Sequence, residues 1–157
     1  MTNSLATETL QQFRIIIGAT RSHFRSLEKA CGISGAQIWI LSAIEASPGI
    51  TVSALSQNLS VHVSTASNML NKLAKAGLVK RLRNEEDRRV VTLHLTAKGQ
   101  TILNRAPRPL TGLVPYALDK LQKKTLTSLN RDLKLLIKEM NYADNDSANK
   151  PLSDLIG

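Results

Sequence analysis

Apolar side chains recur at alternating spacings of three and four residues near both ends of the chain, which is the pattern of an amphipathic helix. Near the N-terminus this row consists of Leu10, Phe13, Ile17, Thr20, Phe24, Leu27 and Cys31. Near the C-terminus it consists of Leu126, Leu129, Leu133, Leu136 and Met140. Gly32 is the expected stop of the first helix. The pattern therefore predicts two long helices, each with one apolar face.

Shorter helices are predicted between these two. Ser34 and Gln37 have the spacing of a capping box, so a second helix is expected to begin there and to end at the turn over 47–49. A short helix over 51–59 and another over about 63–76 follow, and only a short turn separates them. Two helices joined in this way form the helix-turn-helix pattern.

A β-hairpin is predicted next. Apolar residues alternate along 90–95, and the pattern over 78–83 indicates a second strand. The loop between the strands, 84–89, carries three acids and two arginines. Thr96 is the expected N-cap of a further helix, and prolines should break that helix near 106–109. The expected fold is one domain over 1–157, mainly α with a small β-hairpin.

The formal net charge of +9 favours a polyanionic partner, either nucleic acid or an anionic membrane surface. Residues 51–100 hold eight Lys and Arg against three Asp and Glu, so much of the excess lies around the helix-turn-helix and the hairpin. Aromatic residues make up only 3%, which disfavours a platform that stacks single-stranded bases. A single cysteine, no signal-peptide pattern and no long apolar run predict a cytoplasmic protein that does not span a membrane.

The order of elements resembles the MarR family of winged helix-turn-helix transcriptional regulators. The Ser34 and Gln37 helix start, the junction LAKAGLVKR over 73–81, and a hairpin signature carry the likeness. This signature consists of Asp87, Arg88, Arg89, Leu93, Leu95, Thr96 and Gly99. The chain departs from the family at His62, where Ser often caps the recognition helix, and at Val63, where Arg is common. These departures bear on base preference.

The resemblance implies that different segments of the chain bind DNA and form the dimer. Residues 34–103 would form a winged helix-turn-helix lobe that binds double-stranded DNA. Residues 5–31 and 104–140 would form the helices of a homodimer, so that two lobes meet an inverted-repeat operator. Residues 143–157 are expected to be a flexible, polar tail, in which PLSDLI docks as one short turn.

The start of the helix over 63–76 is where DNA sequence would be read, because a helix fits the major groove. Asn68 can pair with an adenine edge and the Thr65 methyl can contact thymine. Arg89, or failing that Arg88, would enter an A·T-rich minor groove, with Asp87 accepting hydrogen bonds from the guanidinium. The other expected DNA contacts are His62, Ser64, Ser67, Lys72, Lys75, Lys80, Arg81 and Arg83. The alternative for both segments is a solvated polar surface without a partner.

The family resemblance also implies release from DNA by a small aromatic or phenolic ligand, for which His23, Trp39 and Tyr116 are the candidate contacts. A thiol-based switch at Cys31 is the alternative, although that residue lies on the apolar face. No metal, cofactor or enzymatic activity is expected, because the three histidines lie far apart and no HExxH, phosphate-binding loop or nucleophile elbow occurs. A nonspecific, nucleoid-associated DNA-binding protein remains the rival to a sequence-specific repressor.

Overall fold

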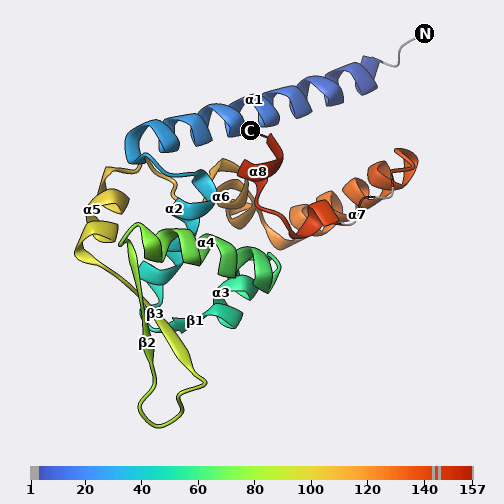
Figure 1. The fold of residues 1–157 in the computed structure, drawn as a ribbon. Helices are drawn as coiled ribbons and strands as arrows, with labels where there is room; N and C mark the ends of the chain where they lie inside the picture. Colours follow the sequence, from blue (N-terminus) through green and yellow to red (C-terminus); the bar gives the residue numbers. More distant parts are fainter. Residues whose placement is uncertain (1–3, 143, 145, 157) are drawn as a thin grey trace.

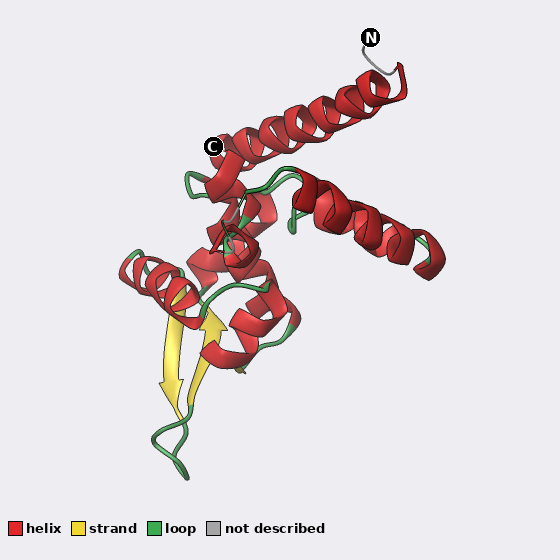
Figure 2. Ribbon diagram, turned by 90° about the vertical axis from the view of Figure 1, so that its right-hand side faces the viewer, coloured by secondary structure: helices red, strands yellow, loops and turns green. Residues whose placement is uncertain are grey.

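The computed structural model describes residues 4–142, 144 and 146–156. Its elements are α1 Ser4–Cys31, α2 Gly35–Ala46, β1 Ile50–Thr51, α3 Val52–Leu59, α4 Val63–Lys75, β2 Val79–Arg83, β3 Val91–Leu95, α5 Ala97–Arg105, α6 Leu113–Lys120, α7 Lys123–Glu139, the 3₁₀ turn η1 Asp146–Asn149 and α8 Leu152–Ile156. The hairpin points away from the body at one end, and α1 and α7 project from the other (Figures 1 and 2). The expected mainly helical fold with a small β-hairpin is confirmed.

Side-chain caps fix where three of the helices begin. The Ser34 hydroxyl accepts from the Gln37 amide at 3.2 Å, and the Gln37 side chain accepts from the Ser34 amide at 3.0 Å, which is the predicted capping box. Thr51 and Thr96 cap α3 and α5 in the same way. Gly32, with φ of 71°, ends α1 as expected.

The sheet has three antiparallel strands in the order β1-β3-β2. Leu93 on the central strand pairs with Ile50 of β1 and Arg81 of β2, and its side chain is fully buried. The predicted hairpin is confirmed, whereas β1 was missed. A strand of two residues is too short to show alternation, so only its partner strand reveals it.

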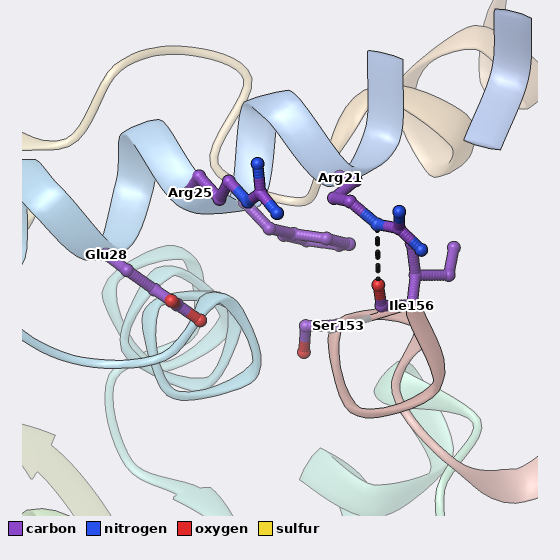
Figure 3. Close-up of a pocket in the computed structure, with 6 residues that line it drawn as sticks. Arg21, Arg25, Glu28, Ser153 and Ile156 are labelled. Atoms are coloured by element: carbon purple, nitrogen blue, oxygen red, sulfur yellow. Dashed lines mark hydrogen bonds between the residues drawn. The ribbon is translucent and has the colours of Figure 1, made fainter. Parts of the chain in front are cut away.

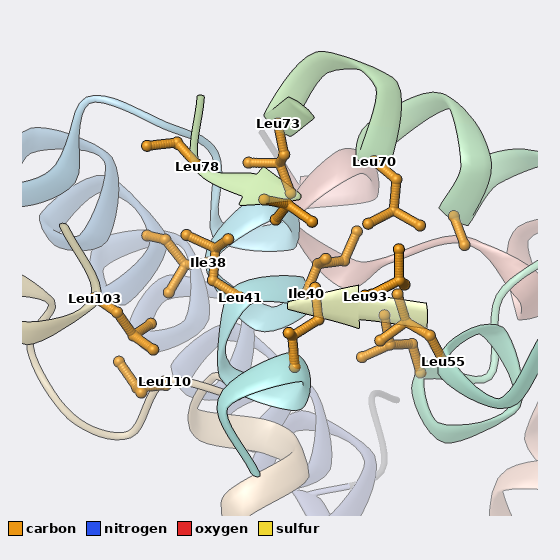
Figure 4. Packing of buried hydrophobic residues seen from close by; sticks show 14 of the residues in the cluster. Ile38, Ile40, Leu41, Leu55, Leu70, Leu73, Leu78, Leu93, Leu103 and Leu110 are labelled. Atoms are coloured by element: carbon orange, nitrogen blue, oxygen red, sulfur yellow. The ribbon is translucent and has the colours of Figure 1, made fainter. Parts of the chain in front are cut away.

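The core forms around α2, which packs against α1, α3, α4, α5 and β3. Because other elements surround α2, apolar residues occur on several of its faces. The largest fully buried apolar side chains are Leu27, Ile38, Ile40, Leu41, Ile44, Leu55, Leu70, Leu73, Leu78, Leu93 and Leu103. Figure 4 shows part of this cluster. This core joins the helix-turn-helix to the base of the hairpin, because Leu70, Leu73, Leu78 and Leu93 belong to the same buried cluster.

The last third of the chain differs from expectation in two places. The break at 106–109 is present, but a second break at Leu121 and Gln122 separates α6 from α7. Neither residue is Gly or Pro, so no helix-breaking residue marks this boundary. The polar segment expected to be a flexible tail contains η1 and α8, with Pro151 buried, and the expected short turn of PLSDLI corresponds to α8. Residues 143, 145 and 157 of that segment lie outside the described residues.

None of the helices that the structure describes is long and apolar enough to cross a membrane.

Candidate nucleic-acid interface

The α4 helix presents one polar face to solvent. Ala66, Leu70 and Leu73 are buried against the core, whereas Ser64 and Asn68 are exposed. The remaining polar residues of this face are Thr65 and Ser67, which are half-buried, and Asn71, Lys72 and Lys75, which are exposed. The helix is therefore divided into an apolar face and a polar face, and Met69 is half-buried.

The start of α4 lacks an ordinary cap. His62 occupies the N-cap position with extended backbone angles, but among the described residues its ring caps no backbone amide. The ring turns instead towards the C-terminal segment, where His62 Nε2 lies 3.4 Å from Asp146 Oδ1. The first amides of α4 thus remain available to an anion at the positive end of the helix dipole.

Two of the three basic residues of β2 lie on the side of α4. Lys80, Arg81 and Arg83 are all exposed. Because side chains alternate along a strand, Lys80 lies on the opposite face, where it lines a hollow with His94 and Gln100. A hollow of about 360 Å³ lies between α4 and the hairpin, and Ser67, Arg81, Arg83, Val52 and Val91 line it. The structure therefore brings Ser67 together with two of the arginines predicted to bind phosphate.

The hairpin loop is held by its own polar side chains. Asn84 Oδ1 accepts from the amides of Glu86 at 2.8 Å and Asp87 at 3.3 Å, and Asp87 Oδ1 accepts from the Arg89 amide at 3.0 Å. These bonds shape the turn by the mechanism typical of Asn and Asp. Sequence reasoning missed Asn84, although an Asn at the first loop position is a recognisable turn signal.

Arg89 lies at the end of this loop with its side chain 96% exposed. Its Nε lies 3.8 Å from Asp87 Oδ1, which is an ion-pair distance but too long for a hydrogen bond. The expected contact between Asp87 and the arginine exists, yet its hydrogen bond goes to the backbone amide and not to the guanidinium. Asp87 therefore fixes the direction of the loop, and the guanidinium remains free to reach outward. Arg88 is exposed beside it.

The three candidate ligand contacts do not meet in one hollow of the described chain. His23 Nε2 lies 2.8 Å from the Pro109 carbonyl oxygen, which ties α1 to the segment before α6. Trp39 lines a hollow of about 440 Å³ together with Val114, Leu118 and Leu152. Tyr116 is half exposed, with Lys120 Nζ 5.2 Å from the ring centroid. Trp39 alone of the three lines that hollow.

Cys31 lies at the end of α1 and is buried, as its place on the apolar face predicts. Its Sγ lies 3.6 Å from the Ile102 carbonyl oxygen. Burial raises the pKa of the thiol, and the nearby Arg105 only partly offsets this. A thiol with a raised pKa is a poor nucleophile towards peroxide, so no structural feature here favours a redox switch.

The comparisons with known proteins agree with this geometry. The sequence model of the MarR family matches residues 33–91. The HTH-type transcriptional repressor MdtR of Bacillus subtilis is 32% identical over 74 residues, which is 47% of this chain and 47% of that repressor, so the match spans about half the length of each. Streptococcus pneumoniae FabT in complex with DNA has a TM-score of 0.60 at 26% identity, over 88% of this chain and 98% of that one.

A second solved structure is a mutant MarR from E. coli complexed with operator DNA. It matches with a TM-score of 0.55 at 26% identity, over 85% of this chain and 99% of that one. The likeness therefore extends beyond the helix-turn-helix to the long terminal helices. Residues 33–91 are thus similar to the MarR family, and the chain has the winged helix-turn-helix fold of the solved FabT and E. coli MarR structures.

Proposed function

We propose that this protein is a transcriptional repressor that binds an inverted-repeat operator in double-stranded DNA as a homodimer. The observation that carries the proposal is the hollow between α4 and the hairpin, where Ser67 of α4 lies together with Arg81 and Arg83 of β2. Its relatives support the proposal, because FabT and E. coli MarR have been solved with DNA and MdtR is named a repressor. Residues 34–103 form the DNA-binding lobe in this proposal.

The exposed face of α4 reads base edges in the major groove. Asn68 is exposed near the middle of that face and pairs with an adenine edge, while Ser64 and Thr65 approach the groove near the helix start. Lys72 and Lys75 lie one and two turns further along and neutralise phosphates. Arg81 and Arg83 hold the backbone beside Ser67, so they set affinity and its salt dependence more than sequence preference.

The hairpin loop supplies the second contact. Its tip is held by Asn84 and Asp87, so Arg89 is presented on a stiff support and not on a loose chain. An arginine presented in this way is suited to a narrow A·T-rich minor groove, where the negative potential is strongest.

The homodimer explains the two projecting helices, which correspond to the proposed dimerisation segments 5–31 and 104–140. Every residue of α7 is described and none is buried, and in α1 no residue before Thr20 is buried. A groove of about 680 Å³ between them is lined by Leu5, Ala6, Thr9, Leu10, Phe13, Ile17, Leu136 and Met140. An apolar surface of this kind is costly in water, and a second copy of the chain would cover it.

The proposal also includes release by a small aromatic ligand. The hollow of about 440 Å³ beside Trp39 has the volume of a typical small-molecule site. It lies between α2, the end of α3, and α6, so a ligand there would change the angle between the DNA-binding lobe and the helices that lead to the dimer interface.

The decisive experiment compares two duplexes at one salt concentration. An inverted repeat selected from a random pool by this protein should bind at least roughly a thousandfold more tightly than a scrambled duplex of equal length and composition. Half-site centres should lie about 10 base pairs apart. A ratio near one would instead establish a nonspecific, nucleoid-associated protein.

Arg89→Ala should weaken binding to an operator with A·T-rich flanks by about tenfold. The reason is the loss of one minor-groove contact, so the loss should be smaller when the flanks are G·C-rich and the groove is wider. Titration of both duplexes with the variant at fixed salt measures the difference. Arg88→Ala removes the same charge from the same loop and serves as the control. Equal losses for the two variants on both duplexes would show that the loop contributes only general charge.

A further inference from the structure

The C-terminal segment returns from the far end of α7 to the body and reaches the start of the recognition helix α4 (Figure 1). Asp146, the first residue of η1, has Oδ1 3.4 Å from His62 Nε2. Its other oxygen, Oδ2, pairs with Lys150. The carboxylate is thus held between Lys150 of its own segment and the ring of His62, the N-cap residue of α4.

The turn that carries Asp146 is shaped by local hydrogen bonds. Asp144 Oδ1 accepts from the Asp146 amide at 3.0 Å, and Asp144 Oδ2 accepts from the Ser147 hydroxyl at 2.8 Å. Lys150 and, to a smaller extent, His62 hold the pKa of the Asp146 carboxyl below its usual value. The segment therefore presents an ionised carboxylate to the helix start at neutral pH.

The following helix α8 anchors this segment to the body. Arg21 Nε of α1 donates to the Ile156 carbonyl oxygen at 3.0 Å (Figure 3). Pro151 is buried, and Leu152 lines the same hollow as Trp39 of α2. Because α8 contacts both α1 and α2, η1 is tethered close to α4 and its effective concentration there is high.

The position that Asp146 occupies is one that a DNA phosphate would also favour. His62 leaves the first amides of α4 without a side-chain cap, and the N-terminus of a helix attracts anions. In the proposed complex this end of α4 approaches the major groove and its flanking phosphates. A carboxylate on His62 and a phosphate on His62 exclude each other, both by charge and by space.

We propose that the C-terminal segment formed by η1 and α8 is an intramolecular competitor of DNA, in which Asp146 occupies the phosphate position at His62 until the operator displaces it. The inference rests on the proposed DNA-binding function. Both side chains of the pair are about half exposed, so the contact is weak enough to be displaced and sets a modest cost on binding. It makes the C-terminal segment a negative regulator of operator affinity.

Asp146→Asn tests this directly, because it keeps the size of the side chain and removes its charge. Operator affinity should rise roughly two- to fivefold at low salt. Asp154→Asn changes the net charge equally in the same segment, but its carboxylate accepts from the neighbouring Ser153, so it should leave affinity nearly unchanged. In a His62→Ala background, Asp146→Asn should add nothing. Equal gains for the two Asp variants, or a gain that survives without His62, would overturn the inference.

A measurement without DNA separates this inference from the proposed function. The ring signals of His62 in an NMR spectrum should move in Asp146→Asn and stay in place in Asp154→Asn, and His62→Ala assigns them among the three histidines of the chain. Unmoved signals would refute the contact. If the signals move but the protein binds no duplex, the contact between Asp146 and His62 is real and the proposed DNA-binding function is wrong. Competition with DNA is then refuted as well.

Discussion

Leu136→Glu should leave the protein monomeric and reduce its affinity for an inverted-repeat operator by roughly a hundredfold or more. Leu136 lies on α7 and lines the apolar groove between α7 and α1, with 41% of its side chain exposed. A carboxylate at this position would be buried without a partner once a second copy covered the groove, and that desolvation is costly. The monomer would keep one DNA-binding lobe and lose the gain from binding two half-sites at once.

Sedimentation at micromolar concentration measures the first effect, and operator titration measures the second. Asn130→Glu introduces the same charge into α7 at an exposed polar position outside the apolar groove, so it should remain dimeric. Circular dichroism should show unchanged helix content in both variants, because glutamate is a good helix former. A Leu136→Glu protein that sediments as a dimer would place the subunit interface elsewhere.

The parts of the fold that sequence alone predicted are those with local causes. The capping box at Ser34, the cap at Thr96 and the stop at Gly32 each depend on residues within one turn of helix, so their spacing is visible in the sequence. The hairpin is local as well. In contrast, β1 exists only because β3 lies beside it, which is a contact between distant parts of the chain. The short turn of α8 was predicted, but its contacts with Arg21 and with α2 are likewise long-range and could not be predicted from the local sequence.

In the candidate DNA site, too, features with local causes could be predicted and features that depend on distant contacts could not. The exposed face of α4 could be predicted from periodicity, because its other face is buried. In β2 only Val79 is buried, so no alternation of burial marks a face of that strand. The hydrogen bond from the Arg89 amide to Asp87 could not be distinguished from a guanidinium contact, since both use the same two residues. The meeting of Asp146 with His62 joins positions far apart in the sequence, and no local pattern foretells it.

Gly99→Ala should lower the free energy of unfolding by about 2–3 kcal/mol, as expected for overpacking against a rigid neighbour. A Cβ at this buried position would clash with the Leu78 carbonyl oxygen and lie 3.1 Å from the Leu78 carbonyl carbon. These are backbone atoms, so they cannot relieve the overlap by a change of side-chain rotamer. The same carbonyl accepts from the Thr96 amide at 3.1 Å, and the Thr96 hydroxyl accepts from the Gly99 amide at 3.0 Å. The start of α5 would therefore have to move away from the base of β2.

Urea unfolding at a fixed protomer concentration measures this loss, because the stability of a dimer depends on concentration. Gly18→Ala is the control, since no atom lies within 4 Å of a Cβ there and Ala is favoured over Gly inside a helix by roughly 0.5–1 kcal/mol. Gly35→Ala is intermediate, because its Cβ would meet the ring of Phe24, a side chain that can turn. If Gly99→Ala were as stable as wild type, α5 would not be held against the wing base. The contact of α5 with Leu78 could then not explain how the strands that present Arg89 are held in place.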